Sequence, residues 1–194
     1  TQNTISNTGT DGILLTNAGA VSVNGGTING AGGDGIHSSD TNLTATNVNI
    51  GGAGTITGDG IEIVNGGSAH TVNLSNNTIK ANASGISTVD SGNAGELVLT
   101  LDGNTLQSLN AGSKALSVLG GGPNSTIVAS MNGGTVIGGA NSGGVVFNQV
   151  TFDASGAALS GTQVAAGNWT IGTNGARVQG DGLRFDGPSG NLAF

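Results

Sequence analysis

The chain contains no cysteine, which excludes a disulfide framework and a cysteine-ligated zinc site. Among its 194 residues there are two prolines and no tyrosine, and charged residues make up only 8%. Four residues are basic and the net charge is −7, so the chain lacks the clustered positive surface that nucleic-acid binding needs. No apolar run approaches the length of a membrane span. We therefore expect neither nucleic-acid binding nor membrane insertion.

What the chain has instead is glycine, asparagine, threonine and serine. Glycine alone accounts for 39 residues, whereas Lys, Glu and Arg, which favour helices, are scarce. The apolar share is 35%, drawn mostly from Val, Ile, Leu and Ala, and the β-branched members of that group suit a pleated surface. This composition predicts an all-β protein.

A short motif recurs along the chain, in which a threonine follows Gly or Asn and precedes an aliphatic residue. The six instances are Asn3-Thr4-Ile5, Gly26-Thr27-Ile28, Gly54-Thr55-Ile56, Asn77-Thr78-Ile79, Asn104-Thr105-Leu106 and Gly134-Thr135-Val136. Their threonines lie 23, 28, 23, 27 and 30 residues apart, a period typical of stacked repeats. Gly and Asn tolerate the left-handed backbone region, so we predict that conformation at Gly26, Gly54, Asn77, Asn104 and Gly134. At this position, which we call the corner, the chain would turn and enter the next strand.

Two further strand signals accompany each repeat. The first is a small residue followed by an aliphatic one, at Gly12-Ile13, Gly35-Ile36, Gly60-Ile61, Gly85-Ile86, Ala115-Leu116 and Gly144-Val145. The second is an alternating pair before the threonine, at Val21/Val23, Val72/Leu74, Leu99/Leu101 and Ala129/Met131. Val48 and Ile50 break the offset to Thr55, as one inserted residue would.

Three short strands per repeat predict a right-handed parallel β-helix of about seven coils, with 23–30 residues per coil. We expect Ile28, Ile56, Ile79, Leu106 and Val136 to form one buried column, and corner Asn and Thr side chains to stack as ladders. We expect residues 1–194 to form one β-helix segment, with regular coils over 1–145 and irregular coils over 146–194. All five aromatic residues lie in the last quarter, and we interpret them as large interior residues rather than a binding patch.

Three aspartates precede successive Gly-Ile pairs, namely Asp11, Asp34 and Asp59. If the register holds, their carboxylates stack on adjacent coils, as in a two-carboxylate glycosidase. However, the chain has no Gly-His-Gly or Arg-Ile-Lys of the kind found in polygalacturonases, and Asp-Gly pairs are also ordinary turn chemistry. We therefore favour turns over catalysis.

Other candidate ligands are few. Residues Asn29–His37 differ from one calcium-binding nonapeptide only at the first position, but the motif does not recur. We interpret His37 and His70 as solvated loop residues, and Glu62 and Glu96 as isolated side chains that face water. The sequence thus predicts no catalytic residue, no cofactor and no metal site.

The repeat pattern and composition resemble the passenger domain of autotransporters, bacterial proteins of type V secretion, over essentially the whole chain. The resemblance implies export to the cell surface, anchored to the outer membrane through a translocator barrel that this chain does not contain. Because neither end of the sequence shows a cap for the exposed strand edges, we also expect the chain to be a segment of a longer passenger. Many such passengers are adhesins or self-associating proteins.

From this resemblance we expect a non-catalytic segment in adhesion or self-association, including aggregation and biofilm formation. Its partners would be a host-cell surface, a matrix protein or glycan, or copies of itself on neighbouring cells. The alternatives are a polysaccharide lyase or hydrolase, including a tailspike-like depolymerase, and a purely structural stalk.

Overall fold

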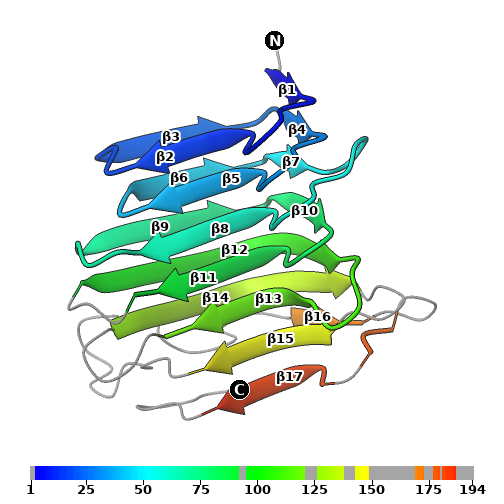
Figure 1. The fold of residues 1–194 in the computed structure, drawn as a ribbon. Coiled ribbons are helices and arrows are strands. Elements are labelled where there is room, and N and C mark those ends of the chain that lie inside the picture. Colours follow the sequence, from blue (N-terminus) through cyan, green and yellow to red (C-terminus); the bar gives the residue numbers. More distant parts are fainter. Residues whose placement is uncertain are drawn as a thin grey trace.

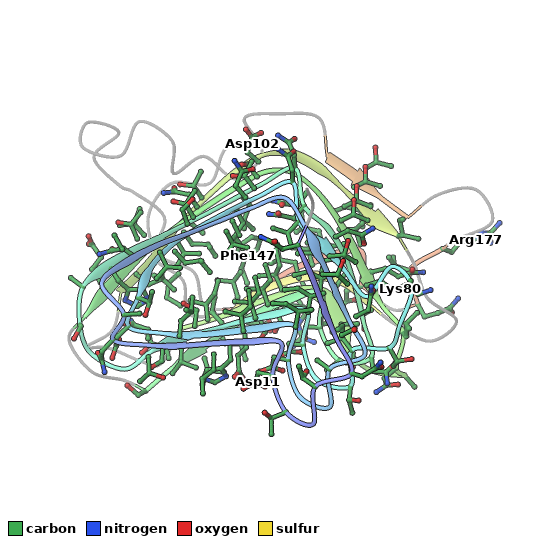
Figure 2. The ribbon with its side chains drawn as sticks, turned by 90° about the horizontal axis from the view of Figure 1, so that it is seen from above. Asp11, Lys80, Asp102, Phe147 and Arg177 are labelled. Atoms are coloured by element: carbon green, nitrogen blue, oxygen red, sulfur yellow. The ribbon has the colours of Figure 1, made fainter. Side chains whose placement is uncertain are left out.

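The computed structural model describes residues 3–91, 95–120, 126–137, 143–148, 169–172, 177–179 and 181–186. These residues form a parallel β-solenoid of about five turns without a helix, so the predicted all-β parallel β-helix is confirmed. Figure 1 shows the coils stacked from the N-terminal end to the C-terminal end. Figure 2, seen down the stack, shows that they enclose one interior, in which Phe147 lies.

Each coil contributes to three columns of strands, and every pair within a column is parallel. The first column precedes the corner and contains β3 (Ala20–Asn24), β6 (Asn42–Thr46), β9 (His70–Ser75) and the first parts of β12 (Glu96–Ser108) and β14 (Thr126–Ile137). The second follows the corner and contains β1 (Thr4–Ser6), β4 (Thr27–Asn29), β7 (Asn49–Ile50), β10 (Thr78–Ala81), the ends of β12 and β14, and β16 (Trp169–Ile171). The continuous strands β12 and β14 join these two columns into one sheet.

The third column forms a separate sheet of seven strands, which we call the second sheet. It contains β2 (Ile13–Thr16), β5 (Ile36–Ser39), β8 (Ile61–Asn65), β11 (Ile86–Asp90), β13 (Lys114–Leu119), β15 (Gly143–Asn148) and β17 (Leu183–Asp186). The aliphatic residues of the Gly-aliphatic signal align across it, from Ile13 with Ile36 to Val145 with Leu183. The predicted register of this column is therefore confirmed.

The interior column after the corner differs from the prediction at one coil. Ile28, Ile79, Leu106 and Val136 are buried and stack in register, but the member between Ile28 and Ile79 is Ile50. Ile56, which we predicted there, is buried in the connection after Ile50. The predicted insertion before Thr55 is therefore wrong. In this coil Asn49 occupies the position of the repeat threonine, and Leu43 and Ala45 of β6 form the alternating pair.

The predicted left-handed corner is also displaced. Gly26 (φ 94°) and Gly134 (φ 156°) have positive φ, whereas Gly54, Asn77 and Asn104 do not, so the prediction for these three is wrong. The left-handed residue is the one before, since Gly25, Asn47, Asn76, Gly103 and Gly133 have φ between 54° and 76°. Gly and Asn occur at that position because they tolerate the left-handed backbone conformation.

Asn77 and Asn104 occupy the corner for another reason, because both are fully buried and form a ladder. Asn104 Oδ1 accepts hydrogen bonds from Asn77 N and Asn77 Nδ2, both at 3.0 Å. The two amide groups also donate to the carbonyl oxygens of Ala45 and Leu74, and Asn77 Oδ1 accepts from Val48 N. The ladder thus pairs the buried backbone groups that the corner leaves free.

Past residue 145, few residues are described. The interpretation of the aromatics as interior residues is confirmed for Phe147, which is fully buried in β15. Phe152 and Phe194 lie outside the described residues, as do the expected strands at 150–152 and 161–164. The irregularity of 146–194 and the total of seven coils therefore stay predictions.

Candidate functional site

The three aspartates lie one above another at the turn that leads into the second sheet, as predicted. Asp34 N donates to Asp11 Oδ1 at 2.8 Å, and Asp59 N donates to Asp34 Oδ1 at 2.7 Å. Ser84 N continues the series by donating to Asp59 Oδ1 at 2.5 Å. Each carboxylate therefore caps the backbone of the next coil with one oxygen, which leaves its Oδ2 for another partner. Figure 2 labels Asp11, at the start of this aspartate ladder, away from the interior that holds Phe147.

At the second coil of the ladder, Asp34 meets a histidine and a glutamate. His37 of β5 and Glu62 of β8 are register partners with outward side chains on neighbouring strands. His37 Nδ1 lies 2.7 Å from Glu62 Oε2 and 3.3 Å from Asp34 Oδ2. The three side chains are partly buried, with 15% of Asp34, 26% of His37 and 23% of Glu62 exposed. We refer to Asp34, His37 and Glu62 as the acid–imidazole cluster.

The electrostatics of the cluster are those of crowded carboxylates. Partial burial raises the pKa of Glu62, and the negative charges of Asp34 and Asp59 raise it further. His37 acts in the opposite direction, since its positive form favours the charged glutamate. Within the described part of the chain, the ion pairs of this cluster involve no Lys or Arg.

The next coil carries the same arrangement with a different residue. Asp59 Oδ2 accepts a hydrogen bond from Ser87 Oγ at 2.6 Å, and Ser87 is the register partner of Glu62. On the coil after Asp59 the equivalent position holds Ser87, a hydroxyl donor, whereas on the coil after Asp34 it holds Glu62, a second carboxylate. His37 Nδ1 contacts both of these acids, Asp34 and Glu62.

Two expectations about these side chains are wrong. His37 and His70 lie in strands, not in solvated loops, and Glu62 contacts His37 instead of standing alone in water. His70 is 5% exposed, and its Nδ1 donates to Ser68 O at 2.7 Å, so it belongs to the interior. Glu96 is exposed at the start of β12, as predicted.

The candidate calcium segment Asn29–His37 uses its side-chain oxygens for contacts between coils. Asn29 Oδ1 accepts from Ala53 N at 3.0 Å, and Asp34 Oδ1 accepts from Asp59 N. These contacts explain Asn29 and Asp34 as parts of the stacked turns. What the segment contributes to the cluster is its pair Asp34 and His37.

The sequence did contain a signal for the cluster. His37 and Glu62 each follow the aliphatic residue of a Gly-Ile pair, so the alignment of Ile36 with Ile61 already places them side by side. The outward position one residue after each buried isoleucine is therefore the signal in the sequence for this contact.

Chemically, the cluster can bind a cation, share a proton between two acids, or attract a polar ligand. Comparisons with protein-family models, with curated proteins and with solved structures find no match to this chain. Within the described ranges, no helix is long and apolar enough to cross a membrane.

Proposed function

We propose that this chain is a segment of a bacterial surface passenger that acts by display, in adhesion to host surfaces or in self-association, without catalysis. The proposal includes the right-handed sense of the solenoid, its position at the cell surface, and its attachment through an outer-membrane translocator barrel. Two features support it: the recurring sequence motif with its Gly-, Asn-, Thr- and Ser-rich composition, and the polar side chains on one outer face of the stack.

The supporting observation is an uncharged polar face on strands β3, β6 and β9. Eight of its nine outward side chains on these strands are polar and the ninth is Ala20; the polar ones are Ser22, Asn24, Asn42, Thr44, Thr46, Thr71, Asn73 and Ser75. Ser22, Thr44 and Asn73 stack in register at its centre and line a shallow open depression of this face. We refer to these nine residues as the polar face.

Contacts between coils hold side chains of the polar face in place. Asn42 Oδ1 accepts from Thr71 N at 2.8 Å, and the hydroxyl groups of Thr46 and Ser75 are 3.0 Å apart. A surface whose rotamers are already fixed loses less conformational entropy on binding. Repeated hydroxyl and amide groups suit a polyhydroxylated partner such as a glycan, or a second polar face. Many weak contacts of this kind add up when the partner is multivalent.

The test places lysines on the polar face and measures binding. We expect the double substitution Thr44→Lys and Asn73→Lys to abolish binding to glycan or matrix-protein arrays, and to abolish clumping of cells that display the chain. The matched control is Thr16→Lys, an exposed position on the second sheet. Equal loss in both variants, or binding unchanged in both, would contradict the polar face as the binding surface.

The acid–imidazole cluster favours a second candidate, a hydrolase or lyase on an acidic or neutral polysaccharide. A glutamate with a raised pKa beside a second carboxylate is the arrangement that glycosidases use as acid and base. The check is release of reducing or unsaturated sugar ends by the purified chain. Release that disappears on Glu62→Gln and on Asp34→Asn would favour the enzyme over display.

A further inference from the structure

We propose that Asp34, His37 and Glu62 bind one divalent transition-metal ion, best matched by Zn²⁺, on the outer side of the second sheet. One ligand atom from each of the three side chains lies within 4.8 Å of the other two. The donors come from two consecutive coils, with Asp34 before β5, His37 in β5 and Glu62 in β8. The ion would therefore link one coil to the next.

One of the two donor separations measured from His37 Nδ1 matches that of a coordinated ion, and the other is shorter. Zinc binds imidazole nitrogen and carboxylate oxygen at about 2.0–2.2 Å, so two donors of a tetrahedral site are separated by about 3.4 Å. His37 Nδ1 is 3.3 Å from Asp34 Oδ2 and 2.7 Å from Glu62 Oε2. A rotation of the Glu62 carboxylate away from the imidazole would admit the ion, which would take the place of the proton on His37 Nδ1. Because all three side chains are partly exposed, water can reach the fourth position.

The surrounding structure orients the donors in advance. Asp34 Oδ1 is held by the backbone N–H of Asp59, which fixes the carboxylate with Oδ2 toward His37. The parallel pairing of β5 with β8 holds His37 and Glu62 on adjacent strands. Interactions that orient metal ligands in this way strengthen binding.

The neighbouring coil supplies an independent comparison. There, Ser87 donates a hydrogen bond to Asp59 Oδ2, which completes the contacts of that carboxylate without a cation. In the acid–imidazole cluster a glutamate takes the place of the serine, so two acids face one imidazole. A bound cation supplies the positive charge that the two carboxylates lack there.

The donor set selects the kind of ion. Ca²⁺ and Mg²⁺ prefer shells made of oxygen ligands, whereas an imidazole with carboxylates suits Zn²⁺ and related first-row ions. The proposal is thus distinct from the nonapeptide calcium site considered for residues 29–37, and it does not depend on the display function.

The experiment titrates ZnCl₂ into the metal-stripped whole chain at pH 7 and follows binding by calorimetry. We expect one Zn²⁺ per chain in the wild type and at least about 10-fold weaker binding for His37→Gln and for Glu62→Ser. The Glu62→Ser variant reproduces the arrangement of Asp59 with Ser87, so it removes a ligand while it retains a partner for Asp34. The matched control, Glu96→Ser, removes an exposed carboxylate elsewhere and should bind as the wild type does.

Thermal unfolding provides a second readout. Zn²⁺ should raise the unfolding midpoint of the wild type and of Glu96→Ser, but not that of His37→Gln or Glu62→Ser, because only a bound native state is stabilised. Absence of zinc binding by the folded wild type would overturn the proposal and leave the cluster as an ion pair. Zinc binding that survives both ligand substitutions would also overturn it, as would Ca²⁺ binding of equal strength that does not need His37.

Discussion

The aspartate ladder and the ladder of Asn77 and Asn104 use the same coil-to-coil geometry in different surroundings. In both, a side-chain oxygen accepts a hydrogen bond from the backbone of an adjacent coil. The asparagines are fully buried and neutral, and their amide groups also donate to main-chain carbonyls. The aspartates are partly exposed, and the second oxygens of Asp34 and Asp59 contact the side chains of His37 and Ser87. The interior ladder therefore satisfies buried polar groups, whereas the outer ladder leaves carboxylate oxygens for contacts with other side chains at the surface.

The largest effect should come from the interior ladder. Asn104→Ala removes the acceptor of two Asn77 donors and the donor to Leu74 O, all in buried surroundings. Asn77 Nδ2 keeps its bond to Ala45 O, so Asn77 N and Leu74 O are the two groups that lose a partner. At about 1–3 kcal/mol for each of these two buried polar groups, we expect a loss of roughly 2–6 kcal/mol in the free energy of unfolding. Urea denaturation followed by circular dichroism measures it. A loss below about 1 kcal/mol would show that the ladder is dispensable.

A pair of substitutions at Asp34 separates capping from charge in the outer ladder. Asp34→Asn retains an oxygen for Asp59 N, so it should change the free energy of unfolding by no more than about 0.5 kcal/mol in EDTA. Asp34→Ala removes the cap and should cost about 1–2 kcal/mol, similar to loss of a helix cap. Urea midpoints of the two variants distinguish these roles. Equal losses would mean that the charge, not the cap, is what the fold requires.

The smallest effect concerns pH. Because the pKa of Glu62 is raised in the folded chain, the stabilising contribution of its protonated form is present below the unfolded pKa, near 4.5, and is lost as the pH rises through the folded pKa. In EDTA, the wild type should therefore lose stability relative to Glu62→Gln between pH 4 and pH 7. The groups that act on Glu62 are Asp34, Asp59 and His37. Urea midpoints across this range measure the difference, and a constant difference would contradict the raised pKa.

Much of the fold could be predicted from the sequence because the column of the second sheet repeats its signal faithfully. Each Gly-Ile pair places a small residue at a crowded turn and an aliphatic one inside; a Cβ on Gly35, for example, would meet Gly60 O and Ile50. The corner was harder to predict. At the third coil, Val48 and Asn49 replace the usual Gly/Asn and Thr, while Gly54-Thr55-Ile56 matches the motif by its letters alone.

The candidate site was only partly predictable. The stacking of Asp11, Asp34 and Asp59 follows from their fixed offset before the Gly-Ile pairs. The contact of His37 with Glu62 requires two coils at once, since neither residue has a partner within its own strand. The buried role of His70 could not be read from its neighbours, because it depends on how the turn at Ser68 folds back toward it.

The unequal coil lengths have a consequence for how such a chain can change over generations. Ile28 and Ile50 are 22 residues apart and Ile50 and Ile79 are 29 apart, yet the three columns stay in register. The connections accommodate the extra residues, and among the described residues each strand is paired with strands of the coil before and the coil after. A duplicated coil would pair with equivalent strands on both sides. A solenoid of this kind can therefore lengthen by gene duplication while the packing of its interior stays the same.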